Sequence, residues 1–142
     1  MATLASDTAA STPASVWTGR ALSGLAAAFL LMDAGTKLVA PVFVAANSPE
    51  IGWSLDPVTI RTLGVLLFVP TLLYLWPRTA LLGAILITGY LGGAIATHTR
   101  IGSPLFTHIL FGVYLALMVW GGLWLRSPAL RALLPLGPGK TD

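Results

Sequence analysis

Four long apolar runs constrain this sequence more than any other feature. They extend over about residues 17–40, 58–76, 79–97 and 105–125. A helix needs about 20 mainly apolar residues to cross the hydrocarbon core of a bilayer, and the runs have about this length. We therefore predict an all-α integral membrane protein, folded as an antiparallel four-helix bundle with both termini on the same side.

The composition supports burial in lipid. Charged residues make up 9% of the 142 residues and hydrophobic residues 56%, whereas a soluble domain carries about 25% charged residues. The absence of cysteine excludes a disulfide framework and thiolate chemistry within this chain. With so few charges, the net charge of +3 does not indicate nucleic acid, and we expect no nucleic-acid partner.

The chain divides into three parts. Residues 1–16 are mostly small and polar, and we expect a disordered tail without a standard signal peptide. Residues 17–125 form the four-helix domain, and residues 126–142 form a basic tail rich in proline and glycine. The polar stretch between the first two runs contains several prolines and is expected to be a loop.

Basic residues predict an orientation. One side of the predicted bundle would hold both termini and the turn between the second and third runs, with Arg20, Arg78, Arg126, Arg131 and Lys140. The other side holds Lys37, Arg61 and Arg100, next to acidic residues. Because cytoplasmic loops carry an excess of Lys and Arg, this distribution favours both termini in the cytoplasm.

A group of ionisable residues is predicted to gather at the end opposite the termini. Asp33 and Lys37 are four residues apart and share one helix face. The antiparallel topology brings His98, Arg100 and His108 to the same end. These residues form either a ligand site or a purely structural group. In the structural alternative, Lys37 pairs with Asp33 and reaches toward the membrane interface, and the histidines lie at helix ends.

Other positions in the spans allow further interpretations. The hydroxyl of Tyr90 is expected to point inward, where it needs a partner. A metal held by His98 and His108 is conceivable, but two histidines without further ligands are a weak signal and no metal site is predicted. Gly89 and Gly93 form a GxxxG pair, expected to pack inside the bundle or at a homodimer contact.

Three segments of the second half of the chain are distinctive: PRTALLGAILITGYLGGAIATHTR at 77–100, GSPLFTH at 102–108 and WGGLWLR at 120–126. Through them the sequence resembles the DoxX-like family of small bacterial four-helix membrane proteins. The resemblance implies a location in the bacterial cytoplasmic (inner) membrane, and some relatives are associated with thiosulfate:quinone oxidoreductase and other membrane redox complexes. One position departs from the family, because Leu67 follows Gly64-Val65-Leu66 where members commonly carry a glutamate.

Two functions of different classes follow. The first is a redox-associated membrane subunit that binds a quinone or another lipophilic ligand at the outer end of the bundle and works with a redox partner protein. Its ligand-binding residues would be Asp33, Lys37, Tyr90, His98, Arg100 and His108. Because no nucleophile–base pair or metal motif is visible, the chain would be at most a subunit of an oxidoreductase. The alternative is a non-enzymatic scaffold or assembly factor for a partner protein.

Overall fold

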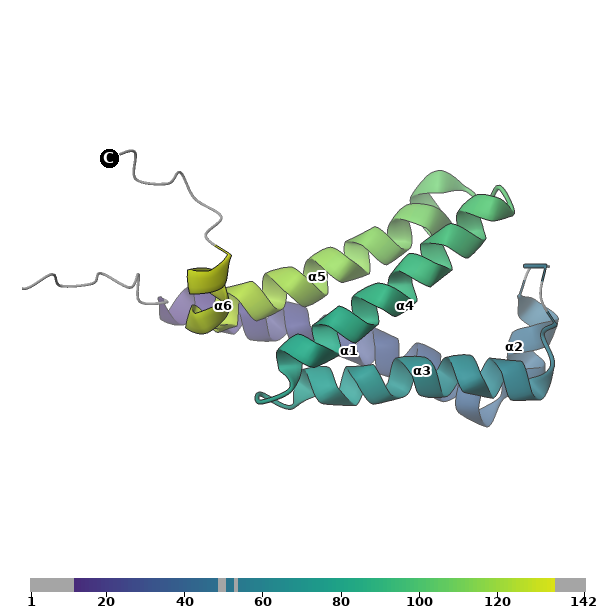
Figure 1. The fold of residues 1–142 in the computed structure, drawn as a ribbon, viewed down its shortest axis with the longest axis horizontal. Helices are drawn as coiled ribbons and strands as arrows, with labels where there is room; N and C mark the ends of the chain where they lie inside the picture. Colours follow the sequence, from purple (N-terminus) through teal and green to yellow (C-terminus); the bar gives the residue numbers. More distant parts are fainter. Residues whose placement is uncertain (1–11, 49–50, 53, 135–142) are drawn as a thin grey trace, which may run out of the picture.

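The computed structural model describes residues 12–48, 51–52 and 54–134, and these residues form an all-α bundle, as predicted (Figure 1). Four helical segments are long and apolar enough to cross a membrane: Pro13–Val39, Pro57–Leu75, Ala80–Arg100 and Leu105–Arg126. They correspond to α1 (Pro13–Val39), α3 (Pro57–Leu75), α4 (Ala80–Arg100) and α5 (Leu110–Arg126), the last preceded by the π-helical turn η1 (Leu105–Ile109). Two short helices, α2 (Pro41–Asn47) and α6 (Pro128–Leu133), complete the described fold.

The long helices form a ring in which each contacts two neighbours. α1 packs against α3 and α5, and α4 packs against the same two helices. Among the described residues, the backbones of α1 and α4, and those of α3 and α5, do not approach each other closely. α3 and α4 leave their tight turn side by side and then diverge, so that α4 approaches α5 at the far end (Figure 1). This divergence creates room at the end opposite the termini.

Helix α1 begins earlier than the sequence predicted. Thr12 caps it, since its hydroxyl oxygen accepts the backbone N–H of Ser15 at 3.4 Å, and Pro13 occupies the first helical position. Proline is favoured there because its missing N–H would have no partner in the helix. The expected disordered tail of residues 1–16 is therefore helical from Pro13 on, and residues 1–11 lie outside the described part.

Proline also explains two helices that the sequence did not predict. Pro41 starts α2 inside the expected loop, and Pro128 starts α6 inside the expected tail of residues 126–142. Ser127 caps α6, because its hydroxyl oxygen accepts the backbone N–H of Leu130 at 3.3 Å. Proline disrupts the interior of a helix but is well suited to its first turn. A proline in the sequence is therefore compatible with a loop and with the start of a helix.

Close backbone contacts hold the helices together near the termini. A Cβ atom added to Gly122 of α5 would lie 2.9 Å from the carbonyl oxygen of Gly19 in α1. A Cβ added to Gly83 of α4 would lie 2.6 Å from Tyr74 Cα in α3. These positions require glycine because the facing atoms belong to backbone that cannot move aside.

A buried tyrosine connects three helices at the same end. Tyr74 of α3 is fully buried, and its hydroxyl donates to the Val119 carbonyl of α5 at 2.8 Å. The same hydroxyl forms a hydrogen bond of 2.7 Å with Ser23 Oγ of α1. A polar group in lipid must find its partner within the protein, so this network specifies how α1, α3 and α5 meet.

Gly83→Ala should destabilise the bundle by about 1–3 kcal/mol, because the new methyl group overlaps the α3 backbone. Gly92→Ala in the same helix is the matched control, since nothing lies within 4 Å of a Cβ there. Thermal unfolding of the two variants in detergent would measure the difference. Equal stabilities would contradict the close contact of α3 and α4.

Asp56 caps α3 just outside the membrane-spanning segment. Its carboxylate accepts the Thr59 hydroxyl at 2.6 Å and the backbone N–H groups of Thr59 and Val58 at 3.1 and 2.8 Å. The hydrogen bond from the Thr59 side chain, with those from the backbone, lowers the pKa of Asp56 from 3.8 to about 2. Hydrogen bonds to a carboxylate favour its charged form.

The cap should therefore persist into strong acid. A group with a depressed folded pKa contributes stability above its unfolded pKa and loses this contribution as the pH falls through the folded pKa. For Asp56 this window lies between 3.8 and about 2. An NMR titration of the Asp56 carboxyl carbon should give a midpoint near the lower value, and Thr59→Val should raise it. An unchanged midpoint in that variant would contradict the assigned role of the Thr59 hydroxyl.

Candidate functional site

A cavity of about 470 Å³ lies at the end of the bundle opposite the termini. Its volume falls in the range of about 300–1,000 Å³ that is typical of small-molecule sites. All four long helices contribute to its wall, together with α2 and the residues before α3. Most of the wall is apolar, with side chains such as Phe29, Leu63, Leu67, Phe111 and Leu115.

The structure brings most of the predicted site residues to this one cavity. Its polar lining includes Asp33, Lys37, Tyr90, His98 and His108. The antiparallel ring explains why, because the second half of α1, the second half of α4 and the turn η1 all reach the same end. The cavity combines an apolar body with polar groups at a few positions, as small-molecule sites do.

Asp33 and Lys37 form an ion pair along α1. The ammonium nitrogen of Lys37 lies 2.5 Å from Asp33 Oδ2. Lys37 is the less exposed partner, with 17% of its side chain accessible against 36% for Asp33. The attraction between the two charges offsets part of their desolvation cost, and the ammonium group keeps further N–H donors.

The two histidines face each other across the junction of α4 and η1. Their ring centroids are 5.4 Å apart with the planes at 60°. His98 Nδ1 forms a 2.9 Å hydrogen bond with Ser103 Oγ, and His108 Nδ1 forms one of 2.9 Å with Thr107 Oγ1. Neither Nε2 atom has a hydrogen-bond partner among the described residues. Each ring therefore keeps one nitrogen that can donate or accept, according to its tautomer.

A metal site finds little support in this geometry. Within residues 12–48, 51–52 and 54–134, no group of three or more His, Asp or Glu side chains could hold a metal ion. His98 and His108 form only a pair, and protein sites for zinc usually provide at least three ligands.

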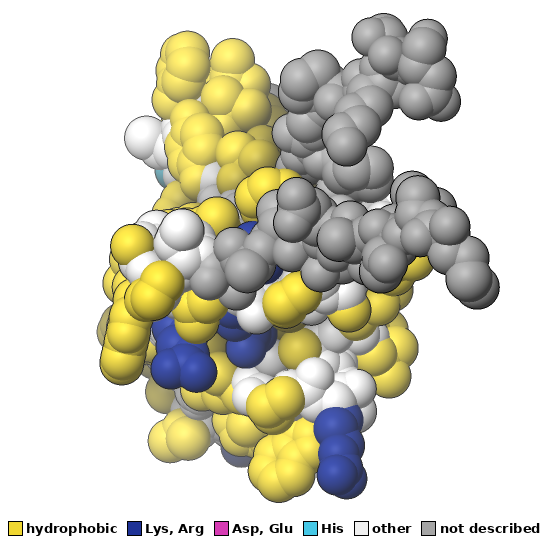
Figure 2. Space-filling model, turned by 90° about the vertical axis from the view of Figure 1, so that its left-hand side faces the viewer, with side chains coloured by type: hydrophobic (Ala, Val, Ile, Leu, Met, Phe, Trp, Pro, Cys, Tyr) yellow, Lys and Arg dark blue, Asp and Glu magenta, His cyan; other side chains and the backbone are white. Residues whose placement is uncertain are grey.

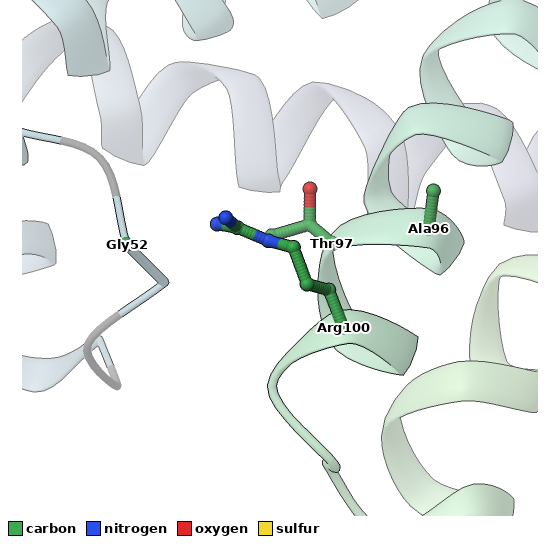
Figure 3. A pocket seen from close by; sticks show the side chains of 4 residues that line it. All are labelled: Gly52, Ala96, Thr97 and Arg100. Carbon is green, nitrogen blue, oxygen red and sulfur yellow. The ribbon is translucent and has the colours of Figure 1, made fainter.

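Arg100 departs from the predicted cluster. It does not line the main cavity, and its guanidinium donates through Nη2 to the carbonyl oxygen of Ile51. Figure 3 shows the side chain reaching from α4 toward Gly52, beside Ala96 and Thr97, where these residues line a separate open pocket. Gly52 has a φ of +75° and is so close to Arg100 that a Cβ would overlap its guanidinium. Arg100 thus attaches the segment before α3 to the end of α4.

Gly89 and Gly93 do not pack against another helix in the described part of the chain. No atom lies within 4 Å of a Cβ added at Gly89, Gly92 or Gly93, so the expected packing inside the bundle is not observed. Gly89 and Gly93 instead line the cavity, and their missing side chains provide part of its space. The closely packed glycines are Gly19, Gly64, Gly83, Gly112 and Gly122.

A family model described as the DoxX-like family matches residues 21–122. The chain belongs to the DoxX-like family. The match covers most of α1, all of α3 and α4, and most of α5, and so includes every predicted site residue of this DoxX-like protein. Neither the curated proteins nor the solved structures give a significant match to the chain.

The departure from the family pattern lies in the cavity wall. Leu67, which stands where the resemblance implies a glutamate, is buried and lines the cavity. A carboxylate here would add a charge beside the polar groups, whereas leucine extends the apolar surface. The sequence alone did not reveal that this position belongs to the site.

The ion pair of this DoxX-like protein can be tested with a double-mutant cycle. Asp33→Asn and Lys37→Met should each destabilise the protein, because each leaves one partner charged and unpaired. The double variant should lose less than the sum, with a coupling energy of about 0.5–3 kcal/mol. Thermal unfolding in detergent measures all three variants. Strict additivity would show that the two side chains do not interact.

Proposed function

We propose that this DoxX-like protein is a redox-associated membrane subunit that binds a quinone, or another lipophilic ligand with a polar ring, in the cavity. The observation that carries the proposal is the cavity of about 470 Å³, apolar over most of its wall and lined by Asp33, Lys37, Tyr90, His98 and His108. A quinone has the same division into an apolar body and two carbonyl oxygens.

The polar groups supply the chemistry that a quinone ring requires. In the tautomer with hydrogen on Nε2, His98 or His108 donates to a carbonyl oxygen, while Nδ1 accepts from Ser103 or Thr107. Tyr90 adds a hydroxyl donor to the lining. Lys37, already beside Asp33, stabilises negative charge that develops on the ring when it is reduced. Arg100 is not part of this proposed site, because it does not line the cavity and its guanidinium donates to the Ile51 carbonyl.

Access from the bilayer supports a lipophilic ligand. Gly89 and Gly93 are exposed as well as part of the cavity wall, and they lie midway along α4. A wall that opens at this depth faces hydrocarbon rather than water, so a membrane-dissolved ligand can enter sideways.

The remaining parts of the proposal concern location and partners. The basic residues on the side of the termini favour their placement in the cytoplasm, with the cavity near the outer face of a bacterial inner membrane. Because the chain contains no cysteine, sulfur chemistry would belong to a redox partner protein.

A second candidate function is that of a scaffold or assembly factor. The observation in its favour is the exposed small-residue surface of α4 formed by Gly92 and Ala96. A helix of a second protein, or of a second copy, can approach such a surface closely. This surface lies beside the cavity but is not formed by the same glycines.

Filling the cavity tests the first proposal. The double substitution Gly89→Leu with Gly93→Leu introduces two large side chains into space where no atom lies within 4 Å of either Cβ. Purified wild-type protein should retain extractable quinone and gain thermal stability with added short-chain quinone. The filled variant should lose at least about tenfold in affinity, which corresponds to about 1.4 kcal/mol.

Gly92→Leu is the matched control, since it adds the same side chain to the same helix outside the cavity. It should bind quinone like the wild type. Absence of quinone and of any stabilisation in folded wild-type protein would overturn the binding proposal. A scaffold would show the opposite pattern, with a stoichiometric partner lost in Gly92→Leu and retained in the cavity-filled variant.

A further inference from the structure

The end of the molecule that carries the termini is basic. It includes Arg20 of α1, Arg78 of the turn before α4, Arg126 of α5 and Arg131 of α6, and none of the acidic residues in the described part of the chain lies there. We call this surface the arginine end. Figure 2 views it directly and shows Lys and Arg side chains set among hydrophobic ones, with no acidic side chain of the described residues in view.

Two of these arginines are held in place by the fold. The guanidinium of Arg126 lies 5.2 Å from the centroid of the Tyr74 ring, and its Nη2 donates to the Tyr74 carbonyl at 3.4 Å. The guanidinium of Arg131 lies 5.9 Å from the centroid of the Trp124 ring. Both groups are thus pre-positioned, which reduces the entropy that is lost when they bind an anion.

Each of these guanidinium groups has an unsatisfied donor. Arg126 Nε and Arg131 Nη2 are buried, and neither has a hydrogen-bond partner in the described part of the chain. The ion pair observed among the described residues, Lys37 with Asp33, lies at the opposite end. Buried donors without partners are rare in folded proteins, and a charged donor selects an anionic acceptor.

The surroundings of Arg131 match the depth of lipid head groups. Helix α6 folds back after Ser127, buries Leu130 and receives a hydrogen bond of 3.0 Å from Trp124 Nε1 to the Leu134 carbonyl. Exposed apolar side chains surround the arginines, among them Trp17, Trp76, Leu133 and Leu134. Exposed tryptophan and leucine next to arginine are typical of the membrane interface.

We propose that the arginine end binds the head groups of anionic phospholipids, with Arg126 and Arg131 each donating to a phosphate oxygen. Guanidinium groups present donors in a fork that matches phosphate oxygens, and basic pockets between membrane helices suit anionic head groups. The acyl chains of the lipid lie along the exposed apolar surface of the neighbouring helices. The site is separate from the cavity and does not depend on a quinone.

The experiment measures lipid binding to the purified full-length chain in detergent by native mass spectrometry, with phosphatidylglycerol and phosphatidylcholine compared. Phosphatidylglycerol should bind preferentially. The double substitution Arg126→Gln with Arg131→Gln should weaken this binding by more than about 30-fold, because it removes two surface charges together with their hydrogen bonds to phosphate.

Arg20→Gln with Arg78→Gln is the matched control, because it removes the same charge from the same end without touching the buried donors. This control should weaken phosphatidylglycerol binding several-fold less than the Arg126→Gln, Arg131→Gln variant does. Equal losses in the two double variants would mean a diffuse basic surface and would overturn the site. Arg126→Lys with Arg131→Lys keeps the charge without the fork, and full binding by this variant would also overturn it.

Inorganic phosphate distinguishes a lipid from a soluble anion. It should not displace phosphatidylglycerol at millimolar concentration, because it cannot use the apolar surface. Efficient displacement would show a site for free phosphate and contradict the lipid proposal. Equal binding of phosphatidylglycerol and phosphatidylcholine by the wild type would contradict it as well.

Discussion

The close approach of helix backbones near the termini is the constraint on which the rest of the structure depends. At Gly19, Gly83 and Gly122 the backbone of the facing helix lies so close that a Cβ atom would overlap it. The buried hydroxyl of Tyr74 connects α1, α3 and α5 in the same region. Helices that are held this closely at one end and diverge at the other leave space at the far end. The cavity is a consequence of that geometry.

The two ends of the bundle differ in electrostatics as well as in packing. The arginine end carries Arg20, Arg78, Arg126 and Arg131, and its charges interact with aromatic rings and carbonyl groups. The cavity end combines charges of both signs, with Asp33 beside Lys37 and Asp56 at the start of α3. One end is therefore suited to the anionic surface of a membrane, and the other can hold polar groups within an apolar wall.

Glycine has opposite roles in the two regions. Gly83 and Gly122 bring helices together, whereas Gly89 and Gly93 have open space around the position of a Cβ and contribute to the cavity. Of these four glycines, only Gly89 and Gly93 have the GxxxG spacing. That spacing describes one helix and contains no information about what faces it. This is why Gly89 and Gly93 were expected to pack and were found beside a cavity.

The amino-acid sequence was sufficient for the class of fold and for the family. Runs of apolar residues predict membrane-spanning helices because hydrocarbon excludes unpaired backbone groups, and short connections make those helices antiparallel. The same topology predicted that Asp33, Lys37, His98 and His108 would gather at one end. The starts of α2 at Pro41 and of α6 at Pro128 could not be predicted from the sequence, since proline both ends and begins helices.

Only the tertiary structure decided which residues share a wall. The direction of the Arg100 side chain, the place of Leu67 in the cavity and the burial of Tyr74 depend on how the helices rotate and diverge. These quantities arise from contacts between residues far apart in the chain. Hydropathy and spacing along a single helix do not contain them, because they report the depth of a residue in the membrane and not its neighbours.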